Sequence, residues 1–196
     1  MAEIRSTMDL VMEKAARMGK ATADEMEQEA SRKQGMQLAA EFLNQESESL
    51  AECLAQQASS LQVITRKGML EALLRNLFLA RDEEGLQRID RAIQGIIELG
   101  GGAGDLTAIC QELQGIISQY DKHRNQYYEQ LKEQMRMQIE QMVAQKTGMP
   151  ADGLNIDPTT EPQFKEEWSR LEGELNGQYE QALEQYRTQL KQRLGV

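Results

Sequence analysis

Apolar residues are most closely spaced between residues 61 and 117, where branched aliphatic side chains recur at intervals of three and four. This spacing is typical of amphipathic helices that bury one face. No segment longer than a few residues alternates apolar and polar side chains, so the pattern disfavours a β-sheet. Residues that favour helices, such as Ala, Leu, Glu, Gln and Met, dominate the chain. The sequence therefore predicts an all-α fold.

The pattern divides the chain into three parts. Residues 1–35 predict an N-terminal amphipathic helix followed by a mostly polar helix, and residues 36–117 predict a helical bundle core. Residues 118–196 predict a long antiparallel, coiled-coil-like arm of two helices. The first helix of the arm should begin near residue 105, and glycines and prolines in a loop at 148–160 should separate it from the second.

Two apolar stripes in the predicted arm should face each other. The first is Ile117, Tyr120, Arg124, Tyr128, Leu131, Met135, Ile139 and Met142, and the second is Trp168, Leu171, Leu175, Tyr179, Leu183, Tyr186, Leu190 and Leu194. Steps of three, four and four residues are closer to an eleven-residue repeat than to heptads. This spacing predicts a nearly straight or slightly right-handed helix pair.

The sequence also predicts where helices begin and end within the core. We expect one helix at about 66–80 and a second at about 83–99, because Asp82 can cap the second helix. The glycine-rich stretch Gly100–Gly104 should form the turn that follows.

Net charge and cysteine usage narrow the class of protein. The formal net charge of −10 argues against a nucleic-acid partner, because phosphate binding depends on Lys and Arg.

The first twenty residues are charged throughout and no apolar run approaches about 18 residues, so we expect neither a signal peptide nor a membrane span. Cys53 and Cys110 lack the spacing of metal ligands and fit reduced thiols, with a single bridge between them as the alternative. We therefore expect a cytoplasmic protein.

Residues that could carry chemistry are few. His123 is the single histidine, and its neighbours Asp121, Lys122 and Arg124 predict a solvent-facing position on the arm. The predicted acidic outer faces name no carboxylate pair for acid–base catalysis; their residues fit helix-supporting pairs with Lys, Arg or Gln. We expect no catalytic residue, no cofactor and no metal site, and hence no enzyme.

The stretch Gly100–Gly104 allows a different interpretation. Its backbone N–H groups could bind a phosphate at the start of the following helix. However, the Lys-Ser/Thr pair that ends a P-loop is missing and no strand is predicted before the glycines. A helix-to-helix turn is the simpler interpretation, and nucleotide binding is kept as an alternative.

Methionines give the N-terminal region its most suggestive feature. The candidate interaction surface consists of Met8, Val11, Met12, Met18, Met26 and Met36. Methionine is flexible and polarizable, and suits surfaces that accept varied partners. The simpler interpretation is that this stripe packs on the protein's own bundle, and partner binding is the alternative.

The opening residues 1–15, MAEIRSTMDLVMEKA, resemble the start of a group of uncharacterised bacterial helical proteins. The resemblance covers these fifteen residues and a general acidic, helical character. It implies no activity.

Three functions remain as hypotheses. The first is a non-enzymatic interaction or scaffold protein that presents long helical surfaces to a protein partner or to itself. The second is a chaperone-like adaptor that binds a client segment through the methionine-bearing helix. The third is a nucleotide-binding protein that uses Gly100–Gly104.

Overall fold

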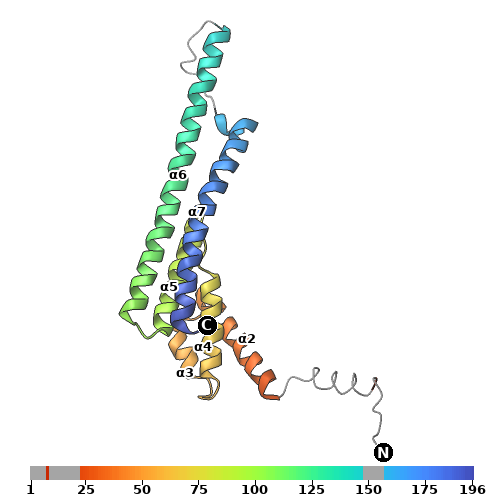
Figure 1. The fold of residues 1–196 in the computed structure, drawn as a ribbon, viewed down its shortest axis with the longest axis vertical. Coiled ribbons are helices and arrows are strands. Elements are labelled where there is room, and N and C mark those ends of the chain that lie inside the picture. Colours follow the sequence, from red (N-terminus) through yellow and green to blue (C-terminus); the bar gives the residue numbers. More distant parts are fainter. Residues whose placement is uncertain (1–7, 9–22, 148–156) are drawn as a thin grey trace, which may run out of the picture. The chain divides into compact units, whose positions relative to one another are not determined.

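The structure is a computed structural model that describes residues 8, 23–147 and 157–196. Within these residues it contains six α-helices, one short 3-10 helix and no strand (Figure 1). The helices are α2 (Ala23–Leu43), α3 (Leu50–Ala55), α4 (Gln62–Arg75), α5 (Glu83–Leu99), α6 (Gly104–Thr147), η1 (Pro158–Thr160) and α7 (Pro162–Leu194). The predicted all-α fold is confirmed, and the long helices α5 and α6 pack against each other. The predicted N-terminal amphipathic helix lies, apart from Met8, outside the described residues.

The chain forms two compact units, residues 1–69 and 70–196, and the division falls within α4. The division into residues 1–35, 36–117 and 118–196 that the sequence predicts stays a prediction.

Two glycines determine how α2 and α4 cross in the first unit. A Cβ atom added to Gly35 would lie 2.0 Å from the carbonyl oxygen of Thr65, and one added to Gly68 would lie 2.0 Å from that of Arg32. No side chain larger than a hydrogen atom fits at either position while the backbones stay this close. Ser31 and Ala39, one turn before and after Gly35, are also buried and complete a small-residue face on α2.

The break between α2 and α3 has a defined cap. Gln45 adopts a left-handed backbone with φ 66° just beyond α2. Its N–H donates to the Phe42 carbonyl at 3.1 Å, and the Glu46 N–H donates to the Glu41 carbonyl at 2.9 Å. These two bonds form a Schellman motif, which satisfies the last carbonyls of the helix. Ser49 then caps α3 by accepting from the Glu52 N–H at 3.2 Å.

In the second unit the core is aliphatic. Its fully buried side chains include Leu70, Leu73, Leu77, Ile89, Ile96, Leu106 and Leu113. Each of them contributes roughly 1.5–3 kcal/mol by leaving water. Asp82 caps α5 as predicted, because its carboxylate accepts from the Gly85 N–H at 2.7 Å.

The helix predicted to reach residue 80 ends five residues earlier, at Arg75. Asn76 ends it by donating from Nδ2 to the Ala72 carbonyl at 2.8 Å. The next residues leave the helix, and the carbonyl of Leu77 accepts two hydrogen bonds from the Arg187 guanidinium of α7. A contact across 110 positions of sequence thus replaces the intrahelical bond that local propensity predicts.

Helices α6 and α7 form the predicted antiparallel hairpin (Figure 1). Side-chain hydrogen bonds join them in order along their length. They link Asp105 to Arg193, Glu112 to Tyr186, Tyr120 to Asn176 and Arg124 to Glu172. The residue number on α7 falls as that on α6 rises, which shows that the helices run in opposite directions.

The two predicted stripes form most of the hairpin interface. Tyr120, Leu131, Met135, Leu183 and Leu190 are buried, and most of the other stripe residues are half-buried or buried. Met142 is the exception: it is 51% exposed, so its assignment to the buried stripe is wrong. Because α7 begins only at Pro162, its helical residues do not extend opposite the last turns of α6.

Candidate functional site

The predicted methionine surface is only partly described by the structure. Met8 is 69% exposed and Met26 is 64% exposed, whereas Met36 is half-buried. Val11, Met12 and Met18 lie outside the described residues. Two of the three described members are therefore accessible to a partner, and the stripe as a whole stays a prediction.

Met26 belongs to a part of α2 that has no buried side chain. Residues 24–30 are all exposed and include the acids Asp24, Glu25, Glu27 and Glu29. A helical segment with so little burial gains its stability from the helix that continues it and not from packing of its own. The packed part of α2 begins at Ser31, where the crossing with α4 starts.

Aromatic side chains hold the outer part of the hairpin together. Tyr128 of α6 lies edge-on to Phe164 and Trp168 of α7, with ring centroids 5.5 and 5.0 Å away. The Arg124 guanidinium lies 5.6 Å from the Trp168 ring centroid, in cation–π distance. Leu131 and Met135 extend this cluster on α6, and Leu171 extends it on α7. These contacts fix the register of the hairpin where its polar contacts end.

The face of α6 turned away from this cluster carries a shallow groove. It has a volume of about 610 Å³ and is lined by Gln126, Glu129, Gln130, Glu133, Gln134, Met137, Gln138 and Gln141. All eight residues are exposed, and Met137 keeps 48% of its surface in water. Tyr127, 41% exposed, and Met142 lie on the same helix. We call the eight lining residues the α6 outer stripe.

Sequence reasoning missed the α6 outer stripe as a candidate surface. Its signal was present in the spacing, because Gln and Glu recur at three- and four-residue steps around Met137. A polar stripe of this kind is usually interpreted as a helix face that is exposed to solvent and binds no partner. Only the position of α7 shows that most of this face lies outside the hairpin interface. Gln134 and Gln138, at its edge, also line a hollow with residues of α7.

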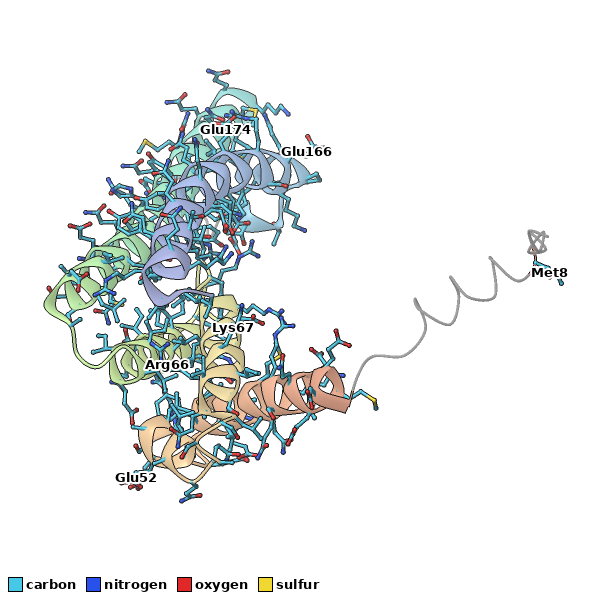
Figure 2. The ribbon with its side chains drawn as sticks, turned by 60° about the horizontal axis from the view of Figure 1, so that its bottom comes forward. Met8, Glu52, Arg66, Lys67, Glu166 and Glu174 are labelled. Carbon is cyan, nitrogen blue, oxygen red and sulfur yellow. The ribbon has the colours of Figure 1, made fainter. Side chains whose placement is uncertain are left out.

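Arginine-centred ion pairs lie along both helices of the hairpin. Arg136 binds Glu133 at 2.7 Å and Glu140 at 3.2 Å, and Arg170 binds Glu167 and Glu174 with the same spacing. The hydrogen bond from Arg136 lowers the pKa of Glu133, and that from Arg170 lowers the pKa of Glu167. Glu174 and the nearby Glu166 lie on the surface of α7 (Figure 2).

His123 is exposed as predicted, but it also contacts α7. Its Nδ1 lies 2.7 Å from the Tyr179 hydroxyl, and the two rings meet edge-on at 6.0 Å. Tyr127, one turn further along α6, is stacked with the imidazole at a ring-centroid distance of 6.3 Å. Burial raises the pKa of Tyr179 above its usual range. This arrangement positions the imidazole across the hairpin and is a structural contact.

The glycine-rich turn uses its N–H groups internally. Gly101 has φ 72° and donates to the Glu98 carbonyl at 3.1 Å, and Gly102 donates to the Ile97 carbonyl at 3.0 Å. This is a second Schellman motif, and the Gly100 N–H also donates back, to Ile96 at 2.9 Å. Three donors that could have bound a phosphate are thus directed into α5. The geometry gives the nucleotide-binding alternative no support.

Both cysteines are free thiols. Cys110 is fully buried, and burial raises its pKa to about 11. Cys53 is half-buried, and its Sγ lies 3.4 Å from the Ser47 hydroxyl. In the described part of the chain, no group of three or more His, Cys, Asp or Glu side chains is placed to hold a metal ion.

The sequence predicts no apolar run long enough for one of the helices to span a membrane. Among those that the structure describes, none combines sufficient length with sufficient apolar content to cross a bilayer.

The fold and these surfaces define an all-α protein built around a long helical hairpin. The chain belongs to DUF6657, a family of unknown function, whose model matches residues 51–192. The match covers α3 to α7 except for the first residue of α3 and the last two residues of α7, and it does not include the opening residues 1–15 that suggested such a family. Comparison with curated proteins and with solved structures gave no match.

Proposed function

We propose that this protein is an interaction or scaffold protein whose α6–α7 hairpin presents helical surfaces to a protein partner or to a second copy of itself. The observation that carries the proposal is the α6 outer stripe. It offers a shallow, open groove of about 610 Å³ with an exposed methionine at Met137, on a helix of 44 residues. Recognition of an exposed helix face by a partner is a recurrent mode of protein–protein interaction, and Met137 is the one apolar side chain of this stripe.

The hairpin is suited to this role because α7 orders α6 by packing on the face away from most of the α6 outer stripe. Tyr120 and Arg124 engage α7 at 2.7 and 2.9 Å, and the aromatic cluster extends the interface toward Leu131. A partner on the opposite face would therefore meet a helix that is already ordered. Less conformational entropy is then lost when the complex forms.

Site-specific photo-crosslinking tests the proposal. A photoreactive amino acid at Gln134, in the α6 outer stripe, should give a discrete adduct in cells, and Met137→Glu in the same chain should abolish it. The same probe at the exposed Gln87 of α5 is the control. An adduct of twice the 22.2 kDa chain mass identifies self-association, and mass spectrometry identifies any other partner. Equal, diffuse labelling from Gln134 and Gln87 would contradict the proposal.

The exposed methionines of the first unit favour a second candidate, a chaperone-like adaptor. Met8 and Met26 are 69% and 64% exposed, and such side chains suit varied client segments. The test replaces both by Gln and measures suppression of aggregation of a destabilised client protein. Loss of suppression supports the adaptor. Unchanged suppression would exclude these two side chains from it, and Met137→Gln serves as the matched control.

A further inference from the structure

A smaller groove lies between α5 and α6 in the second unit. It has a volume of about 270 Å³. Leu86, Ile89 and Ile117 give it an apolar lining, and the two isoleucines are at most 2% exposed. Its remaining lining residues are polar: Asp90, Gln114, Ser118 and Asp121. The groove therefore combines apolar side chains with two carboxylates.

Among the residues that the structure describes, the two carboxylates have hydrogen-bond donors but no cationic partner. Asp90 accepts from the Gln114 amide at 2.9 Å, and Asp121 accepts from the Asn125 amide at 3.3 Å. Neither forms a salt bridge with any residue in the described part of the chain, whereas Glu133 and Glu167 on the hairpin are both paired with arginine. Each carboxylate can accept further hydrogen bonds, since an ionised carboxylate has about four acceptor positions.

We propose that this groove binds an arginine side chain of a protein partner. The methylene groups of arginine would pack on Ile89 and Ile117, as such stems do on apolar surfaces. The guanidinium, with five donors in a planar fork, would reach Asp90 and Asp121. Charge complementarity favours this occupant, and the net charge of −10 also attracts cations at longer range.

An arginine fits the groove better than a bare divalent ion. Calcium takes six to eight oxygen ligands, and this groove offers two carboxylates, one hydroxyl and one amide. The apolar lining would leave an ion with few ligands on one side. A side chain that is apolar along its stem and charged at its end matches both parts.

The inference deepens the proposed interaction role and rests on it for its biological use. It assigns the partner an exposed arginine, and it concerns a surface on α5 and α6 distinct from the α6 outer stripe. Binding at the groove can therefore be measured without knowing the partner and without involving Met137.

The experiment titrates ¹⁵N-labelled full-length protein with N-acetyl-arginine amide and follows the backbone amide shifts. N-acetyl-citrulline amide, which has nearly the same shape without the charge, is the matched ligand. We expect saturable shifts around Asp90 and Asp121 with the arginine ligand, and at least about tenfold weaker binding of citrulline, since charge-assisted hydrogen bonds are lost. N-acetyl-lysine amide should bind more weakly than arginine because it lacks the planar fork.

Variants locate the binding. Asp90→Asn/Asp121→Asn should remove the saturable shifts while the remaining spectrum shows an intact fold. The control Glu46→Gln/Glu166→Gln removes two exposed carboxylates elsewhere and should bind as the natural chain does. The proposal is overturned by shifts that never saturate, by equal binding of citrulline, or by unchanged binding in the Asp90/Asp121 variant.

The groove proposal and the proposed function fail separately. A flat titration removes the arginine site and leaves crosslinking from Gln134 unaffected. Loss of specific crosslinking from Gln134, with saturable arginine binding retained, would remove the role of the α6 outer stripe and keep the groove.

Discussion

At the scale of single residues, two kinds of glycine can be distinguished within the described helices. Gly35 and Gly68 sit where two helix backbones nearly touch, whereas Gly115 and Gly173 lie within helices and have no neighbouring atom within 4 Å of the place that a methyl group would occupy. The sequence shows both kinds as glycine within a helical pattern. Their opposite effects on stability follow only from what lies opposite each residue.

Replacing Gly35 by Ala should therefore destabilise the first unit. The new Cβ would be 2.0 Å from the Thr65 carbonyl oxygen, so α2 and α4 must move apart, at a cost of roughly 1–3 kcal/mol in the free energy of unfolding. Gly173→Ala should instead stabilise by about 0.5–1 kcal/mol, because alanine favours the helix and has room. Urea unfolding followed by circular dichroism measures both. An unchanged Gly35→Ala protein would contradict the observed crossing.

Cys110 gives a residue-scale dependence on pH. Its folded-state pKa is raised to about 11 from an ordinary value of 9.0, so between these values the unfolded chain loses a proton that the folded chain keeps. The contribution of Cys110 is fully present below pH 9 and falls by about 2–3 kcal/mol as the pH approaches 11.

The matched variant for this prediction is Cys110→Ala, which has no thiol to ionise. The difference in unfolding free energy between the natural chain and the variant should shrink between pH 9 and pH 11. All other titratable groups are the same in both proteins. A constant difference would mean that the thiol is not held neutral by burial.

At the scale of helices, the two Schellman motifs carry different residues at the left-handed position just beyond the helix. The motif after α5 places Gly101 in the left-handed position at φ 72°, and the motif after α2 places Gln45 there at φ 66°. A residue with a Cβ atom is disfavoured in this conformation by roughly 1–2 kcal/mol. Gln45→Gly should therefore raise the melting temperature, and Gly101→Ala should lower it.

Differential scanning calorimetry checks both cap variants. Gly104→Ala, at the first residue of α6 with ordinary backbone angles, is the control and should change little. Destabilisation by Gln45→Gly would show that the Gln45 side chain contributes more than its backbone conformation costs.

The polar contacts across the hairpin are a second helix-scale feature. Tyr120 is 1% exposed and donates to the Asn176 side-chain oxygen at 2.7 Å. Tyr120→Phe should cost about 1–2 kcal/mol, because the bond is lost and the Asn176 amide is left without this donor. A double-mutant cycle with Asn176→Ala should give a coupling energy of about 0.5–1.5 kcal/mol.

Tyr128→Phe is the control for the hairpin cycle. Tyr128 contacts α7 through its ring faces and edges, so loss of the hydroxyl should have little effect. Coupling near zero between Tyr120 and Asn176 would argue against the observed register of α6 and α7.

At the scale of the whole molecule, periodicity predicted the long helices well. The first arm helix was expected from about residue 105, and α6 runs from Gly104 to Thr147. The two stripes predicted the hairpin interface because side chains three and four apart share a face. The prediction that Met142 is buried was wrong because burial on α6 also depends on where α7 begins. The spacing of residues on α6 alone gives no information on that point.

The features that sequence could not predict involve partners distant in the chain. The early end of α4 depends on Arg187, and the contact of His123 with Tyr179 depends on the register of the hairpin. The α5–α6 groove likewise exists only because Asp90 and Asp121 come to lie around the same hollow. Local propensity contains no information on such pairings.

The charge of the molecule should determine its behaviour in acid. Hydrogen bonds from arginines lower the pKa of Asp105, Glu133 and Glu167 in the folded state. The stability that these groups contribute is present above their unfolded-state pKa and is lost as the pH falls through the lowered values. At the same time, protonation of the 32 acidic residues leaves 22 Lys and Arg charges unbalanced. The melting temperature should therefore fall between about pH 5 and pH 3.

Two adjacent glutamates provide the test of this acid dependence. Glu167 binds Arg170, whereas Glu166 forms no salt bridge with a residue that the structure describes. Glu167→Gln should reduce the fall in melting temperature between pH 5 and pH 3, and Glu166→Gln should leave it unchanged. Both variants remove one carboxylate from the same turn of α7, so net charge alone predicts the same curve for both. Identical curves would therefore show that general charge imbalance, and not the arginine-centred ion pairs, determines acid unfolding.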